Sequence, residues 1–445
     1  MTAVAGGGVN LEQNYGIPCA PISAHTMEAV AKSDPRAIAL PVIYIPNPAI
    51  GASPDTLYKK LLEGNNPETG RRVIDEIIEV LTKPQKPGKR ETEAYEPRPA
   101  EKTLTGTEDE LQQLFYERGW TDGNPIILPT EERVQRMLRG TSHKPDEEVG
   151  QTYDHDHHEI IRYNVRNIAI TAVMAGAKPE YFPVLLAIAS MKQSSIAPST
   201  TAFGSMLLVN GPIRNEIKMN SGIAAFSPIN QANSVIGRAW TLMSICWGYA
   251  RVKRTLWSSQ GCNELYNNNC IAENEERSAW EPFHVEKGFK AEESVVSMFR
   301  GWAMVNSIGC AANRPLHEEL SRQFAAIPPL GSRATIIMDP LVAYNLKENE
   351  GFATKLDYCK HLSENITMKA GDYWKTDHID MLVSSEAVKG VEPFATWKAL
   401  PEDALFAPFF IPENINLIVT GGETSPLWKA SEYGYSGSAS IDAWR

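Results

Sequence analysis

A thiol, several carboxylates and an imidazole lie within fifteen residues of one another in the second half of the chain. The segment begins with Cys270-Ile-Ala-Glu273-Asn-Glu-Glu276 and ends at His284. A cysteine can act as a nucleophile, and a carboxylate or a histidine can act as a general base. Neighbouring acids can also raise one another's pKa, so that one of them donates a proton at neutral pH. These residue types predict catalytic roles for Cys270, Glu273, Glu276 and His284. The alternative interpretation is a charged surface loop beside a small buried cysteine.

A second group combines turn residues with two arginines. The strand-like run 205–209 is followed by Asn-Gly-Pro, and polar residues precede the helical pattern that starts at 230. Backbone N–H groups at such turns and helix starts can hold an anion, and arginine can bind a carboxylate or phosphate with two hydrogen bonds. The alternative is ordinary turn and capping chemistry. The predicted substrate-binding residues are Asn210, Arg214, Asn220, Ser221 and Arg238.

Three of the nine histidines occur within four residues, in the run Asp154-His-Asp-His-His-Glu159. Imidazole and carboxylate groups are ligands that zinc, iron and copper accept, so the run suggests a transition metal ion as a cofactor. The candidate ligands are His155, His157 and His158. The spacing fits neither the HExxH motif nor a facial triad with a remote third ligand, however. The alternative is a solvated polar loop ahead of a helix, with acidic residues near its positive end. The sequence identifies no other cofactor.

Composition excludes several classes of function. The chain has 445 residues, 42% of them apolar and 22% charged, which is typical of globular proteins with two or three domains. The net charge is −11 and no three basic residues are consecutive, which argues against nucleic acid and anionic membranes as partners. We expect no signal peptide and no membrane helix. Six scattered cysteines without a CxxC motif favour free thiols and a cytoplasmic location.

Helices and strands must position these residues, and the sequence pattern of these elements predicts an α/β fold in two parts. Residues 1–82 form an incomplete, doubly wound α/β layer with a strand at 39–45 and helices from 53 and at 71–81. Residues 83–103, which contain four prolines, form a linker. Residues 104–445 form a larger mixed α/β domain, with strands at 205–209, 334–338 and 415–420 and a helix at 230–250. No internal repeat is visible. An incomplete sheet leaves an edge strand with unpaired backbone groups, which another chain can cover, so we expect an oligomer.

These blocks together resemble the UGSC-type (seleno)protein family over nearly the whole chain. Two segments carry much of the resemblance: Gly119-Trp-Thr-Asp-Gly-Asn-Pro125 and Trp280-Glu-Pro-Phe-His-Val-Glu286. Residues 16–82 are similar to the later half of the family's N-terminal domain. The other resembling segments are 129–134, 167–181, 209–214, 220–222, 236–238, 270–276 and 418–422.

The resemblance implies thiol or selenol reductive chemistry of the glycine reductase component B kind. The family's defining motif of selenocysteine or cysteine followed by Gly, Ser and Cys belongs upstream of Gly16-Ile-Pro18, and the residues that precede this point do not match it. Two interpretations follow from this departure: a small partner chain completes the N-terminal domain and carries the redox group, or the chain uses metal chemistry in place of thiol chemistry.

Three hypotheses follow. The first is a subunit of a thiol- or selenol-dependent oxidoreductase that acts on a small polar or anionic molecule. The second is a metal-dependent lyase or hydrolase that uses the histidine cluster. The third is a non-catalytic subunit of a larger enzyme complex.

Overall fold

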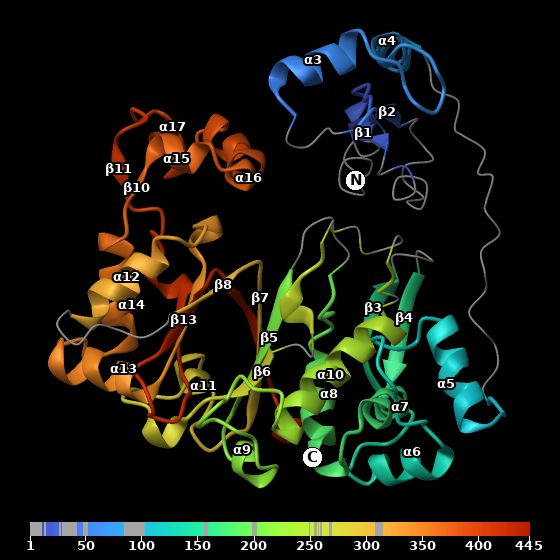
Figure 1. Cartoon of the computed structure of the whole chain (residues 1–445), viewed down its shortest axis with the longest axis vertical. Coiled ribbons are helices and arrows are strands. Elements are labelled where there is room, and N and C mark those ends of the chain that lie inside the picture. The colour runs from blue at the N-terminus through green and yellow to red at the C-terminus, as the bar shows by residue number, and fades with distance from the viewer. Residues whose placement is uncertain are drawn as a thin grey trace.

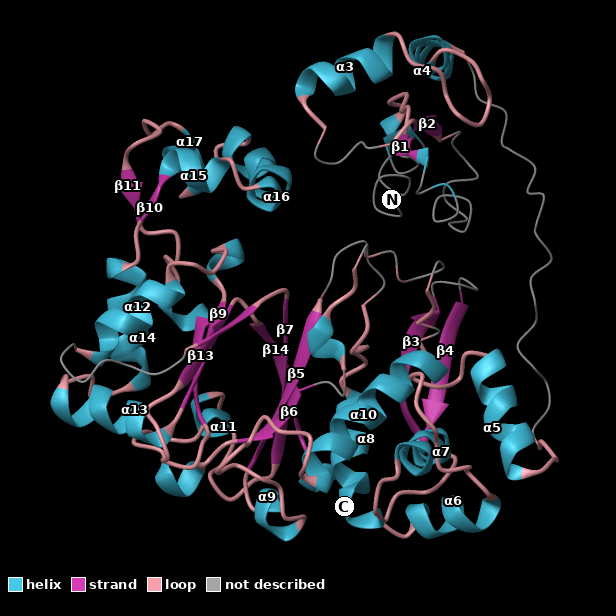
Figure 2. Ribbon diagram, in the orientation of Figure 1, coloured by secondary structure: helices cyan, strands magenta, loops and turns pink. Residues whose placement is uncertain are grey.

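The structure, a computed structural model, confirms the α/β class. It describes residues 11–12, 15–25, 28, 42–47, 52–83, 103–154, 159–197, 203–248, 250–252, 256, 258, 260–266, 269–307 and 315–445. Figures 1 and 2 show a small N-terminal unit and a main body with sheets at its centre and helices on both sides. No helix among these residues is both long enough and apolar enough to cross a membrane.

The described part of the N-terminal unit contains both strands and helices. Strands β1 (Ile22–Ala24) and β2 (Ile43–Ile45) pair in parallel, and helices α3 (Pro54–Leu62) and α4 (Val73–Thr82) accompany them. The side chain of Ser53 caps α3 by accepting a hydrogen bond from the N–H of Thr56, and Pro54 occupies the first helical turn. Most of the predicted linker, residues 84–102, lies outside the described residues.

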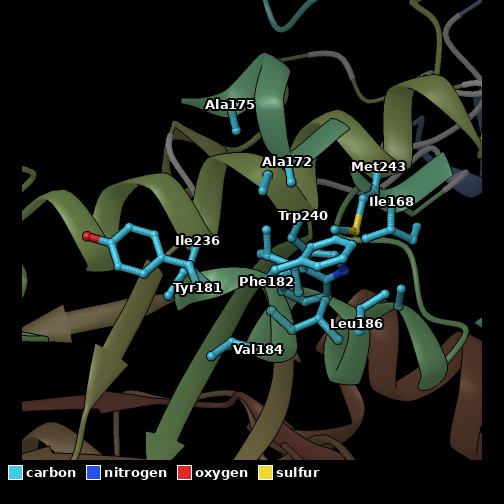
Figure 3. Packing of buried hydrophobic residues seen from close by; sticks show 14 of the residues in the cluster. Ile168, Ala172, Ala175, Tyr181, Phe182, Val184, Leu186, Ile236, Trp240 and Met243 are labelled. Atoms are coloured by element: carbon cyan, nitrogen blue, oxygen red, sulfur yellow. The ribbon is translucent and has the colours of Figure 1, made fainter. Parts of the chain in front are cut away.

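The main body begins with helices that pack together. They are α5 (Glu108–Glu117), α6 (Glu131–Leu138), α7 (Val165–Ala175), α8 (Phe182–Ser190) and α10 (Gln231–Cys246), with a hairpin of β3 (Glu148–Asp154) and β4 (Glu159–Asn164) before α7. Figure 3 shows Ile168, Phe182 and Trp240, one from each of three helices, packed in this layer. Because nearly all of α8 is apolar, the helix is buried from Phe182 to Ala189.

Two four-stranded sheets form the centre. The first has the order β14-β7-β5-β6, and the second has the order β12-β9-β13-β8. In each sheet one strand pair is parallel, β5 with β6 and β9 with β12, and the other pairs are antiparallel. The strands of the first sheet are β5 (Gly204–Asn210), β6 (Asn269–Ala272), β7 (Val295–Gly301) and β14 (Gly434–Ser440); those of the second are β8 (Met304–Asn306), β9 (Ala334–Met338), β12 (Ile415–Val419) and β13 (Trp428–Ser431).

The two sheets are stacked between two layers of helices. In β5, Leu207 and Val209 face the helices, whereas Met206 and Leu208 face the second sheet, since successive side chains of a strand point to opposite faces. Helices α12 (Leu316–Phe324) and α14 (Lys355–Asn365) pack on the outer face of the second sheet. The main body is therefore a four-layer α/β sandwich, visible edge-on in Figure 1.

The two halves of the main body repeat one connectivity, although the sequence shows no repeat. The order helix, strand, short helix, long helix, strand runs through α8, β5, α9, α10 and β6, and again through α12, β9, α13, α14 and β12. The last strand of each half then pairs in the sheet of the other half. The chain passes from β7 to β8 in the second sheet, and from β13 to β14 in the first.

A small helical insertion interrupts the second half before β12. It comprises β10 (Met368–Lys369), α15 (Ala370–Trp374), α16 (Asp377–Val388), α17 (Phe394–Lys398) and β11 (Leu405–Phe406), and it has an aromatic core of its own around Tyr373 and Trp397. The remaining short elements are η3 (Pro179–Tyr181), α9 (Ile213–Glu216), η4 (Asn263–Leu265), η5 (Glu275–Arg277), α11 (Phe283–Glu286), η6 (Leu330–Ser332), α13 (Pro340–Tyr344), η7 (Asn345–Asn349), η8 (Pro412–Asn414) and η9 (Asp442–Trp444).

The packing between the sheets generates a stability prediction. Ile418 is fully buried there, so Ile418→Ala should lower the free energy of unfolding by about 2–5 kcal/mol, because it leaves a cavity in the core. Urea unfolding followed by circular dichroism measures this loss. Val388→Ala, at a side chain that is 84% exposed, is the matched control. Equal effects of the two substitutions would contradict a packed interface between the sheets.

Candidate functional site

The candidate site lies where the carboxyl ends of the parallel strands from both sheets meet. The N–H of Asn274, just after β6, donates to the carbonyl of Val419 at 2.8 Å, and the hydroxyl of Thr420, just after β12, donates to the carbonyl of Ala272 at 2.9 Å. In open α/β sheets, ligands bind at this end of the strands.

Glu273 is the buried centre of this site. Its side chain has no exposed surface, and its Oε2 accepts hydrogen bonds from the Asn210 amide at 2.6 Å and from the Phe283 N–H at 2.7 Å. Its Oε1 lies 3.4 Å from the ammonium of Lys355, which is 6% exposed. A buried carboxylate is tolerated only when it is paired and hydrogen-bonded, and Glu273 meets both conditions.

Arg214 joins the other carboxylates of the cluster. Its guanidinium donates to both oxygens of Glu276, at 3.2 and 3.1 Å, lies 3.0 Å from Glu275, and donates to the backbone carbonyl of Glu273 at 2.6 Å. Partial burial opposes the ionisation of Glu276, but hydrogen bonds from Arg214 and Asn215 outweigh it and lower the pKa of Glu276 to about 2. Arg214 is therefore occupied by carboxylates of its own chain.

The structure separates Cys270 from this cluster. Cys270 lies on β6 and packs among the helices of the first layer, whereas Glu273 points to the other face of the strand. Burial raises the pKa of the Cys270 thiol well above its ordinary value, so the thiol stays protonated.

His284 follows Phe283, whose N–H binds Glu273, and it is fully buried on α11. Its Nε2 lies 3.4 Å from the carbonyl of Ala291, and its Nδ1 is buried without a hydrogen-bond partner in the described part of the chain. The imidazole does not line the pocket described below.

The remaining predicted binding residues tie loops together. The N–H of Asn220 donates to the Asn233 side chain at 2.9 Å, and the carbonyl of Ser221 accepts the N–H of Gly421 at 2.9 Å. Arg238 makes two hydrogen bonds to the carboxylate of Asp122, at 2.8 and 3.0 Å. Their observed contacts are all with groups of the same chain.

The predicted metal ligands His155, His157 and His158 lie outside the described residues. Within the described ranges, no group of three or more histidine, cysteine or acidic side chains is arranged to hold a metal ion.

A pocket of about 630 Å³ opens beside Lys355. It lies between the first turn of α14, the outer side of β12 and the segment that follows β6. Three lysines and three glutamates line it together with apolar side chains. The principal lining residues are Lys287, Lys347, Lys355, Glu281, Glu286, Glu413, Trp280, Ile415 and Leu417.

The charged groups of the pocket are already oriented. Lys355 lies 3.7 Å from Glu286 as well as 3.4 Å from Glu273. Lys287 lies 2.8 Å from the other oxygen of Glu286, and Lys347 donates to the carbonyl of Ala279 at 2.7 Å. Lys355 thus connects the buried carboxylate to the open pocket.

Sequence reasoning missed Lys347 and Lys355. A usable signal for Lys355 was present, since Thr354 and Asp357 form a capping box that starts a helix at Lys355. The sequence gives no signal for the pairing of Lys355 with Glu273, which is 82 residues away.

Comparisons of the chain with protein-family models, with curated proteins and with solved structures find no match. The resemblance to the UGSC-type family therefore stays a prediction, carried by the segments quoted above.

The ion pair of Glu273 and Lys355 generates a second prediction. Lys355→Met leaves Glu273 as a buried charge without its cation, so it should lower the free energy of unfolding by about 3–5 kcal/mol. The double variant Glu273→Gln/Lys355→Met removes both charges and should be less destabilised than Lys355→Met alone. Urea unfolding of the variants measures both effects. Equal losses in the single and double variants would show that the charge left on Glu273 costs nothing.

Proposed function

We propose that the chain is a subunit of a thiol- or selenol-dependent oxidoreductase, and that it binds a small anionic substrate in the pocket beside Lys355. The observation that carries the binding proposal is the presence of three lysines in one pocket, one of them fixed between two carboxylates. The redox chemistry is supported by the family resemblance.

The electrostatics of the pocket favour an anion. Lys287 and Lys355 share Glu286, and Lys355 is also paired with Glu273, so two carboxylates match these two ammonium groups. Lys347 is bound only to a neutral carbonyl among the contacts of the described residues. The first turn of α14 adds the positive end of a helix dipole. A carboxylate or phosphate of the substrate would complete these charge-assisted hydrogen bonds.

The apolar side of the pocket fits the rest of such a substrate. Trp280, Ile415 and Leu417 line it, and the indole N–H of Trp280 is already bound to the carbonyl of Phe352 at 3.1 Å. The ring therefore offers its apolar surface to a ligand while its polar atom stays satisfied. The size of the pocket is within the range of small-molecule sites.

The reactive thiol or selenol is proposed to come from a partner chain. Burial raises the pKa of Cys270 and of Cys359, and the thiol of Cys359 lies 3.3 Å from the carbonyl of Ile415. Such protonated, enclosed thiols are poor nucleophiles. In the proposed reaction, a pair of thiols or a thiol and a selenol of the partner is oxidised to a disulfide or selenenylsulfide while the substrate gains two electrons and two protons.

Binding of anions to the pocket is directly testable. Lys347→Met should weaken the binding of pocket-sized anions by about ten- to a hundredfold, because a charge-assisted hydrogen bond contributes about 1.5–3 kcal/mol. Phosphate, succinate and benzoate, titrated by calorimetry, are suitable probes. Lys389→Met, which changes an exposed lysine paired with Glu386, is the control. If both variants bind the probes as the unmodified protein does, the pocket is not the anion site.

The proposed partner is tested by intact-mass spectrometry and elemental analysis of the untagged protein from its native cells. We expect a small co-purifying chain with an alkylatable thiol or selenol. A near-stoichiometric transition metal without such a chain would instead support lyase or hydrolase chemistry at His155, His157 and His158. Anion binding without turnover, partner or metal would indicate a non-catalytic subunit.

A further inference from the structure

The chain passes between the two sheets at two places, and one carboxyl joins them. The first crossing, at Trp302 and Ala303, leads from β7 to β8; the second, at Glu432 and Tyr433, leads from β13 to β14. The carboxyl of Glu432 accepts the backbone N–H of Trp302, and both its oxygens lie 3.1 Å from the N–H of Ala303. One side chain thus ties together the two segments that link the halves.

Glycines make the space that this arrangement needs. A Cβ at Gly301 would lie 2.8 Å from each carboxylate oxygen of Glu432 and 2.5 Å from the ring of Tyr433, and a Cβ at Gly204 would meet the hydroxyl of Tyr433. Glu432 is 4% exposed and Tyr433 is fully buried. The carboxyl is therefore enclosed by backbone from both sheets.

The charges around Glu432 do not neutralise it. Among the residues that the structure describes, no lysine, arginine or histidine forms an ion pair with it. Glu264 on η4 faces it and accepts the hydroxyl of Tyr433, and Cys262 lies near both carboxyls. Lys429 on β13 is close enough to Glu264 for their charges to interact. Burial, with a smaller contribution from the charge of Glu264, outweighs the hydrogen bond from the Ala303 N–H, which favours the ionised carboxyl, and raises the pKa of Glu432 to about 7.

We propose that Glu432 makes this crossing a pH-sensitive junction, closed when its carboxyl is protonated and loosened when the carboxyl ionises. A neutral carboxyl accepts the two N–H groups without burying a charge beside Glu264. Because the group binds its proton more tightly in the closed state than in an open one, the stability of the closed junction is complete below pH 4.5. It falls as the pH rises towards 7 and then levels off. The junction lies at the amino ends of the parallel strands, opposite the candidate site, and is independent of the proposed function.

Hydrogen exchange of the full chain, followed by mass spectrometry on peptides that cover 295–306, tests the junction. After correction for intrinsic exchange, protection of these amides should fall about tenfold between pH 6 and pH 8, as the shift of one carboxyl from 4.5 to 7 requires. In Glu432→Gln, which keeps an acceptor oxygen but stays neutral, protection should not change with pH. Glu348→Gln, at an exposed carboxyl, should behave as the unmodified protein.

Two results would overturn the proposal: no change of protection in the unmodified protein, or the same change in Glu432→Gln. A second variant covers a failure of Glu432→Gln to fold. Glu264→Gln removes the neighbouring charge that raises the pKa of Glu432, so it should move the loss of protection to lower pH. An unmoved profile in a folded Glu264→Gln would equally count against the junction.

Discussion

The pairing of Glu273 with Lys355 is the interaction on which the candidate site depends. Glu273 follows a strand of the first half of the main body, and Lys355 begins a helix of the second half. A carboxylate without exposed surface is stable only while its hydrogen bonds and its cation are in place. The same lysine lines the pocket, so the contact that satisfies a buried charge also fixes the position of a cation at the pocket wall.

The part of the site that the sequence predicted is the part that is local in the fold. Asn210 is the last residue of β5 and Glu273 directly follows β6. Because β5 and β6 are parallel neighbours, their carboxyl ends bring the two side chains together. Lys355 could not be found in this way, because a contact across 82 residues depends on how the two sheets stack. The sequence is limited in the same way for Cys270. Its residue type was informative, but the face of the strand on which it lies decides its environment.

The fold was predictable at the level of elements and not at the level of their arrangement. The runs at 205–209, 334–338 and 415–420 are mostly apolar, and all three are strands within one residue of the predicted bounds. β14 reads Gly-Tyr-Ser-Gly-Ser-Ala-Ser and has no apolar alternation to indicate a strand. β8 and β14 each pair in the sheet of the other half. The sequence of one half alone therefore cannot predict the repeated connectivity.

The two halves share a connectivity but differ at the positions that correspond to the pocket. In the second half, the first turn of α14 faces open space beside β12. In the first half, the start of α10 is engaged: Asn230 donates to the carbonyl of Lys218, and Asn233 pairs with Asn220. The loop that precedes α10 packs so closely on Gly422 that a Cβ at Gly422 would lie 2.4 Å from the backbone nitrogen of Ile223. The first half therefore engages the start of its long helix in hydrogen bonds, whereas the lysines of the second half line an open pocket.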